Sequence, residues 1–262
     1  MAALPTLFVS HGSPDIALRA TPAHEFLKGL AGTLPRPRAI LVATAHFMTA
    51  MPAVSAPAEP ETIYDFGGFP DPLYEMVYPA RGDTELGREI AGRIAAAGFE
   101  AGFSDRRGLD HGTWIPLILA WPKADVPVLQ LSVQPRLDAA HHLAVGRAIA
   151  GLREEGILVI GSGAMTHNLR EAFAMGPEAD NDAVAWVDDF ADWIDARAEA
   201  GDVEALVDYR ARAPHAARNH PTDEHLLPLH VALGAAGEGA KGTVLHRSRD
   251  YGALRMDAIS FS

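Results

Sequence analysis

Three histidines of this chain occupy positions where a metal could be bound. His11 and His46 each come directly after a short apolar run, and His167 lies in a loop that follows another such run. In open α/β sheets, ligands bind at the edge formed by the carboxyl ends of the strands. Imidazole is the commonest metal ligand and suits iron, zinc, copper or nickel. Each histidine alone fits an ordinary hydrogen-bonded loop residue better, whereas for three at one sheet edge a metal site and ordinary loop positions are about equally plausible.

Two further histidines are candidates for the same site. The stretch Thr222-Asp223-Glu224-His225 is typical of a helix start, with Thr222 as N-cap and His225 in the first turn. The positive end of a helix disfavours imidazolium, so the ring would stay neutral and able to bind a metal. The alternative is an exposed histidine without a ligand. His111 lies in a glycine-flanked loop before an apolar helix, a pattern that fits a functional turn and an ordinary connection equally well.

The segment Gly161-Ser162-Gly163 gives little support for two other site types. It lacks the lysine of a phosphate loop and the full G-x-G-x-x-G spacing of a dinucleotide site. It also fails the G-x-S-x-G pattern of a nucleophilic serine. His141 and His142 are interpreted as solvent-facing residues of an early helical turn. The histidines interpreted as structural are His24, His215, His220, His230 and His246.

The elements that would position these residues alternate between strands and helices. Continuous apolar runs predict strands buried on both faces over 4–10, 38–45, 126–133 and 157–160. Helices are predicted over 23–30, 83–98, 115–121, from the third strand to about 155, and over 181–200, 203–209 and 222–233. After Gly242 the pattern predicts two antiparallel strands around Tyr251-Gly252. We therefore expect one α/β domain over 1–262, with a mixed, mostly parallel central sheet flanked by helices and the metal site at the strand C-terminal edge.

The segment 48–82 is the longest stretch without clear periodicity. It is rich in proline, glycine and aromatic residues. A loop of this length within a compact domain is usually functional or disordered. Its part 63–70 is too aromatic for disorder, so we predict an ordered flap.

Composition excludes several classes of function. Cysteine is absent, which rules out disulfides, thiolate metal sites and a cysteine nucleophile. The net charge is −12 without a basic stripe, so nucleic-acid binding is not expected. Apolar runs are too short for a signal peptide or a membrane span. We therefore expect a cytoplasmic protein with no membrane partner, and the oligomeric state stays open.

Six motifs in order resemble one family. They are His11-Gly12-Ser13-Pro14, Thr44-Ala45-His46, the flap stretch 64–70, the stretch 110–117 around His111, the stretch 161–169 ending beyond His167, and Glu224-His225-Leu226-Leu227-Pro228-Leu229. Together they span residues 8–233. The sequence resembles the DOPA-dioxygenase type of class III extradiol ring-cleavage dioxygenases, which is related to the catalytic subunit of protocatechuate 4,5-dioxygenase.

The resemblance implies a role for each of five histidines. His11, His46 and His225 would bind the metal, His167 would be the acid/base residue, and His111 would assist oxygen or substrate. The protocatechuate enzymes use a glutamate as third ligand, whereas Glu224-His225 points to histidine here. Fe(II) is expected for activity, but a neutral three-histidine site also suits Zn(II).

The activity that the resemblance implies is extradiol cleavage of a catechol, DOPA-like or related, by O2 to a hydroxymuconic semialdehyde. Two alternatives stay open at this stage. One is a zinc hydrolase that uses the same site, with His167 or Glu224 as base. The other is a non-catalytic member of the scaffold that binds metal or peptide.

Overall fold

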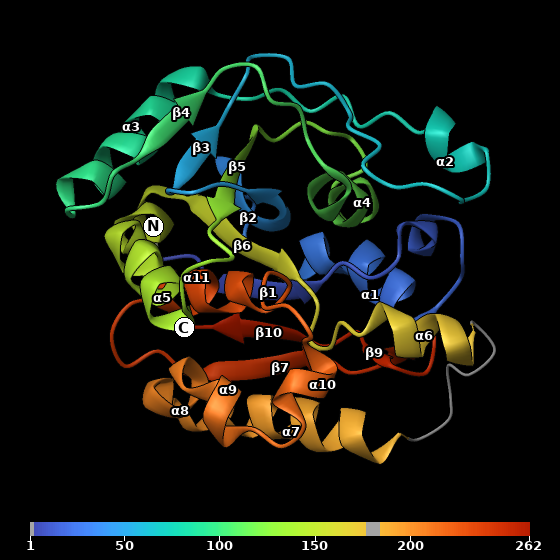
Figure 1. The fold of residues 1–262 in the computed structure, drawn as a ribbon. Helices are drawn as coiled ribbons and strands as arrows, with labels where there is room; N and C mark the ends of the chain where they lie inside the picture. Colours follow the sequence, from blue (N-terminus) through green and yellow to red (C-terminus); the bar gives the residue numbers. More distant parts are fainter. Residues whose placement is uncertain (1–2, 177–183) are drawn as a thin grey trace.

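A computed structural model of the chain describes residues 3–176 and 184–262. In this part of the chain the main sheet has the strand order β4-β3-β5-β2-β6-β1-β10-β7 (Figure 1). The four inner strands are parallel. They are β5 (Val128–Val133), β2 (Ala39–Met48), β6 (Ile157–Gly163) and β1 (Thr6–Ser10). All residues of β1, β5 and β6 are buried, which explains why these strands read as continuous apolar runs.

Antiparallel pairings at both sides make the sheet mixed, as predicted. β10 (Ala258–Phe261) pairs antiparallel with β1 and with β7 (Gly242–His246), and β3 (Ala53–Ser55) pairs antiparallel with β5. β4 (Gly102–Ser104) closes the far edge parallel to β3. The predicted hairpin around Tyr251-Gly252 is a separate pair, β8 (Arg249–Asp250) with β9 (Leu254–Arg255).

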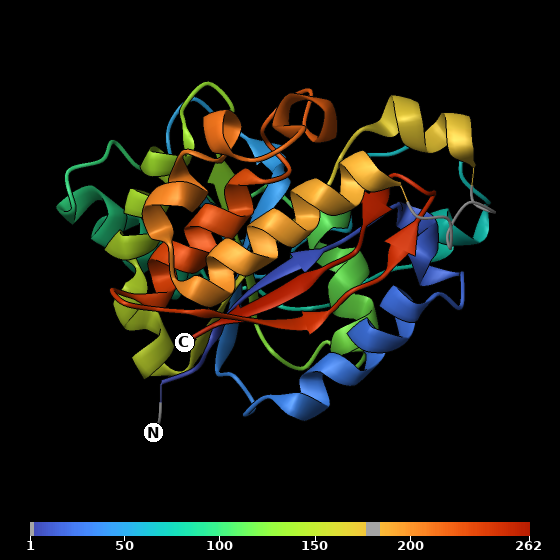
Figure 2. The same ribbon diagram turned by 90° about the horizontal axis from the view of Figure 1, so that it is seen from below.

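Helices cover both faces of the sheet because successive strand residues point to opposite sides. Ile40 and Val42 of β2 pack with α1 (Pro22–Leu30) and α4 (His111–Ala120), whereas Leu41 packs with α3 (Thr84–Ala96) and α11 (Leu227–Ala236). α11 is buried along its whole length between the sheet and α5 (Ala139–Ala148). α7 (Ala185–Ala200) lies along β7, the edge strand opposite β4 (Figures 1 and 2).

The remaining helices are short. They are α2 (Pro72–Glu75), α6 (Leu169–Met175), α8 (Val203–Val207), α9 (Tyr209–Arg212), α10 (Ala216–Asn219) and the 3-10 helices η1 (Pro14–Ala17), η2 (Ala31–Thr33) and η3 (Ala150–Glu155). The flap 48–82 is ordered and contains β3 and α2. Within the described ranges, no helix is both long and apolar enough to cross a membrane.

Two predicted helix starts were wrong. The helix predicted over 115–121 begins at His111, with Asp110 in extended conformation before it. The helix predicted from Thr222 begins at Leu227, because Pro228 fits the first turn of a helix and residues 221–226 form a turn instead. The predicted helix 181–200 begins at Ala185 in the described part, and residues 181–183 lie outside it.

The predicted exposure of His142 was also wrong. Its side chain is fully buried, and Nε2 accepts the backbone N–H of Gln134 at 2.9 Å. Nδ1 donates to the carbonyl of Asp138 at 2.7 Å. Both ring nitrogens are therefore used, and burial lowers the pKa of His142 to about 3.

Candidate functional site

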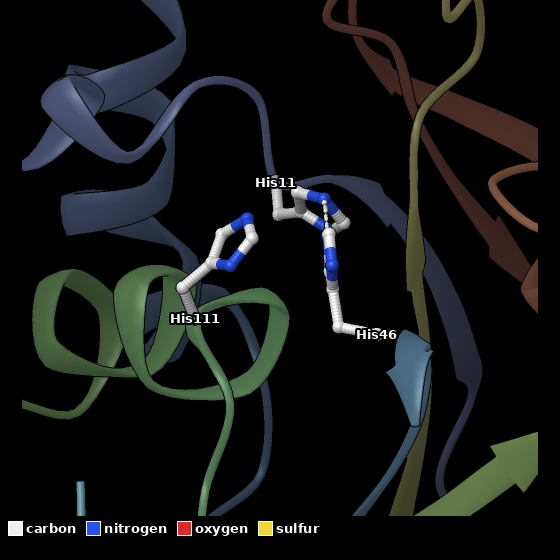
Figure 3. Close-up of side chains that lie close together, drawn as sticks. All are labelled: His11, His46 and His111. Carbon is white, nitrogen blue, oxygen red and sulfur yellow. Dashed lines mark hydrogen bonds between the residues drawn. The ribbon is translucent and has the colours of Figure 1, made fainter. Parts of the chain in front are cut away.

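Five histidines from separate segments meet at one edge of the sheet. His11 directly follows β1, His46 lies within β2 two residues before its end, and His111 is the first residue of α4. His167 lies between β6 and α6, and His225 lies in the turn before α11. All five line one pocket of about 330 Å³. Figure 3 shows the rings of His11, His46 and His111 approaching one another from three different elements.

Three of these rings direct the same nitrogen toward a common region. Nε2 of His46 lies 3.1 Å from Nε2 of His11 and 3.3 Å from Nε2 of His225. His46 thereby links two groups of potential metal-binding side chains. One group is His11, His46 and His111, and the other is His167, Glu224 and His225.

The opposite nitrogen of each ring faces an oxygen atom. The hydroxyl of Ser162 lies 3.0 Å from Nδ1 of His11 and donates its own proton to the carbonyl of Gly112. Because that carbonyl can only accept, the serine must accept from His11, so Nδ1 carries the hydrogen and Nε2 the lone pair. Glu224 Oε1 lies 3.0 Å from Nδ1 of His225 and favours the same tautomer.

His46 has a comparable but longer contact. Oδ2 of Asp65, from the flap, lies 3.5 Å from Nδ1 of His46. Oδ1 of the same carboxylate accepts the backbone N–H of His111 at 2.9 Å and lies 3.0 Å from Nδ1 of the His111 ring. Burial raises the pKa of Asp65, but its contacts with His111 outweigh this and lower the pKa to about 2. The flap therefore places one ionised carboxylate against two of the histidines.

Burial keeps the clustered rings neutral. It lowers the pKa of His11 and of His225 well below the usual value, and the neighbouring histidines lower both further. The pKa of His46 falls to about 3, again chiefly through burial. The predicted cause for His225 was wrong, because this residue precedes α11 and does not belong to its first turn. Desolvation, rather than the positive end of a helix, disfavours its charged form.

The remaining two histidines, His167 and His111, each lie against a different ring of the cluster. The ring of His167 stacks on that of His225, with centroids 3.4 Å apart and planes at 11°. Burial lowers the pKa of His167 to about 4, so this ring is neutral at pH 7 and can accept a proton. His111 lies beside His46, with ring centroids 3.9 Å apart.

The glycines around Ser162 explain how His225 reaches the site. A Cβ atom at Gly163 would lie 2.0 Å from the carbonyl oxygen of His225, and one at Gly161 would lie 2.1 Å from that of Pro228. Only glycine lets the turn before α11 and the first turn of α11 itself pack so closely on β6. The carbonyl of His225 also accepts the N–H of Ala164 at 2.9 Å. Since successive strand residues face opposite sides, Ser162 points away from this turn and toward His11.

The sequence did not identify three polar residues that orient the histidine rings. Asp65 appeared only as part of an aromatic flap, Ser162 only as a rejected motif, and Glu224 only as a possible base. Asp65 is 46 positions from His111, and Ser162 is 151 positions from His11. No local pattern reports such contacts, although the hydroxyl between two glycines of a buried strand was a usable signal.

Asp110 is a fourth residue of this kind. It is fully buried and accepts hydrogen bonds from Thr44 at 2.8 Å and Gln130 at 2.7 Å, with Arg107 at 3.0 Å. These contacts fix the start of α4 against β2 and β5, and His111 is the next residue. Asp110 thus positions His111 through the backbone.

Comparison with known proteins gives one consistent result. Residues 8–257 match the family described as the catalytic LigB subunit of aromatic ring-opening dioxygenase. The chain is 42% identical to a 4,5-DOPA dioxygenase extradiol of Beta vulgaris, over 98% of this chain and 96% of that protein. It is 38% identical to the protein of the same name in Escherichia coli K12, over 98% of this chain and 94% of that one. The crystal structure of an uncharacterized protein from Escherichia coli K12 aligns with a TM-score of 0.78 at 31% identity, covering 98% of this chain and 99% of that chain.

Proposed function

The chain belongs to the family of the catalytic LigB subunit of aromatic ring-opening dioxygenases, and from that premise we propose how its pocket performs extradiol cleavage. The family is metal-dependent and acts on an aromatic ring with O2. We propose that His11, His46 and His225 bind Fe(II), that a catechol binds to this ion, and that His167 and His111 move protons. The product would be a hydroxymuconic semialdehyde.

One observation carries the proposed ligand set. Three neutral rings direct Nε2 toward one another at 3.1 and 3.3 Å, while their Nδ1 atoms face Ser162, Asp65 and Glu224. Facing lone pairs repel unless a cation lies between them. A metal about 2.0–2.1 Å from each nitrogen would place neighbouring nitrogens about 2.9–3.4 Å apart. The donor set therefore fits a single transition-metal ion.

Neutral ligands also suit the proposed substrate. Three imidazole ligands bring no negative charge into direct contact with a divalent ion, so the ion itself favours an anionic ligand such as an ionised catechol. When bound, Fe(II) supplies the electron transfer between substrate and O2, which Zn(II) cannot supply because it has no redox chemistry. The oxygen atoms at Nδ1 of each ligand fix the ring orientations and raise the basicity of the rings.

His167 and His111 are assigned to proton transfer. His167 is neutral, lines the pocket and stacks on the proposed ligand His225, so it can take a proton from a catechol hydroxyl. His111 is held by Asp65 through its backbone N–H and lies beside His46. From there it can donate a proton to oxygen during ring opening.

Several finer assignments belong to the same proposal. The names of the relatives make DOPA the first catechol to test. We propose that residues 1–262 form one catalytic domain. The cytoplasmic location and the lack of nucleic-acid partners stay predictions from the sequence.

An oxygen-uptake experiment tests the proposal. The protein is reconstituted anaerobically with Fe(II) and mixed with DOPA and simpler catechols in aerated buffer. We expect catechol-dependent O2 consumption and a yellow semialdehyde product, with the Zn(II) form and Fe(II)-treated His46→Ala silent. Equal activity of the Fe(II) and Zn(II) forms, or hydrolysis of esters or amides by the Zn(II) form, would instead support a hydrolase.

A further inference from the structure

Two hydrogen bonds tie the loop that carries His167 to the end of α10. The backbone N–H of His167 donates to the carbonyl of Asn219 at 2.9 Å. Nε2 of His220 lies 2.9 Å from the carbonyl oxygen of Met165, and because a carbonyl can only accept, the ring must donate its Nε2 hydrogen. The end of α10 therefore fixes the backbone of this loop at His167 and at Met165, two residues before it.

Asn219 and His220 are held in place by hydrogen bonds of their own. Both residues are fully buried. The side-chain amide of Asn219 donates to the carbonyl of Trp186 in α7 at 3.0 Å. The backbone N–H of His220 donates to the carbonyl of Ala216, at the start of α10, at 2.9 Å. The imidazole that reaches Met165 is therefore anchored by two helices before it contacts the loop.

The same segment leads into the turn that carries His225. His220 stands five residues before this proposed metal ligand. The carbonyl of His225 accepts the N–H of Ala164 at 2.9 Å, and its ring stacks on His167 with centroids 3.4 Å apart. The bond from His220 to Met165 thus joins the chain segment of the proposed ligand to the loop of the proposed base, so it helps to set the position of one ring relative to the other.

We propose that His220 is a positioning residue, which holds the His167 ring where it can take a proton from a bound catechol. The inference rests on the proposed function, because it assumes that His167 is the base. His220 does not belong to the described lining of the pocket, so its effect would pass through the backbone of the loop. A displacement of about 1 Å at a reacting group can lower a rate by about 100-fold.

Substitutions of His220 can separate its hydrogen bond from its volume. His220→Phe keeps a ring but removes the donor, and Nδ1 of His220 has no hydrogen-bond partner among the described residues, so the bond to Met165 is the one lost there. His220→Gln places an amide N–H near the position of Nε2 and should restore that bond. His220→Asn places its amide near the position of Nδ1, short of Met165, and replaces His220→Phe if the latter fails to fold.

His230 in α11 provides a matched control. It is also fully buried, and its Nε2 donates to the carbonyl of Leu206 in α8 at 2.9 Å. His230→Phe therefore removes the same kind of hydrogen bond, at a residue outside the described pocket lining. Both phenylalanine variants should lose stability in urea unfolding, because each leaves a buried carbonyl without its donor. A difference between them in turnover then reports where the bond lies rather than the loss of a bond.

Turnover of the Fe(II) form is the first readout. His220→Phe should lower kcat for catechol oxidation by about 10- to 100-fold, with KM and the Zn(II) dissociation constant unchanged. His220→Gln and His230→Phe should keep kcat close to that of the wild type. In the His167→Ala background, His220→Phe should lower kcat no further, because its effect passes through the missing ring.

Hydrogen exchange of the metal-free protein is a readout that does not depend on activity. The backbone N–H of His167, which donates to Asn219, is the amide to follow. It should exchange about 2- to 10-fold faster in His220→Phe than in His230→Phe, the effect of losing one hydrogen bond beside it. In His220→Gln its exchange should return to the rate of the wild type.

The outcomes separate this inference from the proposed function. If His220→Phe changes kcat and exchange no more than His230→Phe, or if His220→Gln is as impaired as His220→Phe, the inference is wrong while the dioxygenase assignment stands. If the losses of His220→Phe and His167→Ala add, or if Zn(II) affinity falls together with kcat, His220 does not act through His167, and the inference also fails. If the wild-type Fe(II) form oxidises no catechol, the proposed function is wrong and the inference falls with it.

Discussion

Replacing Ser162 by alanine tests whether ring orientation controls metal binding. The hydroxyl accepts from Nδ1 of His11 and donates to the carbonyl of Gly112, and the serine is fully buried. Without it, His11 loses the contact that holds the proton on Nδ1 and the lone pair on Nε2. Loss of such a supporting contact typically weakens metal affinity by about 10- to 100-fold. At about 1.4 kcal/mol per factor of ten, this corresponds to about 1.4–2.8 kcal/mol.

The same substitution should also lower the stability of the metal-free protein. It leaves two buried polar groups without partners, each costing about 1–3 kcal/mol. A control is therefore needed that loses buried hydrogen bonds elsewhere. Ser132 in β5 is equally buried, and its hydroxyl accepts from the N–H of Ala53 at 2.8 Å and from Gln134 at 3.0 Å. It contacts none of the five pocket histidines.

Two measurements on both variants decide the question. Urea unfolding gives the free energy of unfolding of the metal-free proteins, and competition with a chromophoric chelator gives the Zn(II) dissociation constant. We expect both variants to lose stability, with only Ser162→Ala losing metal affinity. If Ser132→Ala loses as much affinity as Ser162→Ala, or if neither loses any, then Ser162 does not orient a ligand and the tautomer reasoning is wrong.

Three further results are expected. His167→Ala should retain the metal but lose about 10²- to 10⁴-fold in turnover, whereas His46→Ala should lose both metal and turnover. Metal content and O2 uptake measure the two effects. If His167→Ala loses as much metal as His46→Ala, His167 is a metal ligand. Gly163→Ala should weaken metal binding and lower the melting temperature, because its Cβ would meet the carbonyl of His225. The control Gly92→Ala in α3 has open space around the new Cβ and should stabilise the protein by about 0.5–1 kcal/mol. Similar effects of the two substitutions would argue against the close approach at Gly163. Burial lowers the pKa of His142 to about 3, so the unfolded chain takes up a proton below pH ~6.5 while the folded chain does not, and stability is lost as the pH falls. In His142→Gln the slope of the unfolding free energy against pH should flatten by about 1.4 kcal/mol per unit between pH 6 and 4, and an unchanged slope would contradict the shift.

The inner strands of the sheet could be predicted because short stretches of the sequence are enough to indicate them. β1, β5 and β6 are buried on both faces, so their apolar runs carry the signal of a covered parallel strand. α3 was predicted well because Asp83 caps it through the N–H of Leu86, a contact three residues apart. Family membership was recognisable for a similar reason, since each motif is a short continuous block.

The starts of two helices, α4 and α11, could not be predicted in the same way. Asp110 looks like part of a loop, yet contacts with Thr44, Gln130 and Arg107 fix it directly before α4. The stretch at Thr222 has the composition of a helix start, but Thr222 donates to Glu224, and Glu224 faces His225. In both places, polar side chains near the expected helix start form contacts with residues in or beside the site, and these contacts decide where the helix begins.

The oxygen atoms behind the three proposed ligands show why the site depends on the whole fold. Ser162 comes from the centre of the sheet, Asp65 from the flap and Glu224 from the turn before α11, yet each faces the Nδ1 atom of one ring. A histidine can present Nε2 to a metal only if its hydrogen is held on Nδ1. A sequence can reveal the imidazoles, because they stand in short motifs, but not the partner that selects the tautomer. Asp65 illustrates the consequence: it contacts His46 and His111 together, so movement of the flap would alter a proposed metal ligand and a proposed proton donor at the same time.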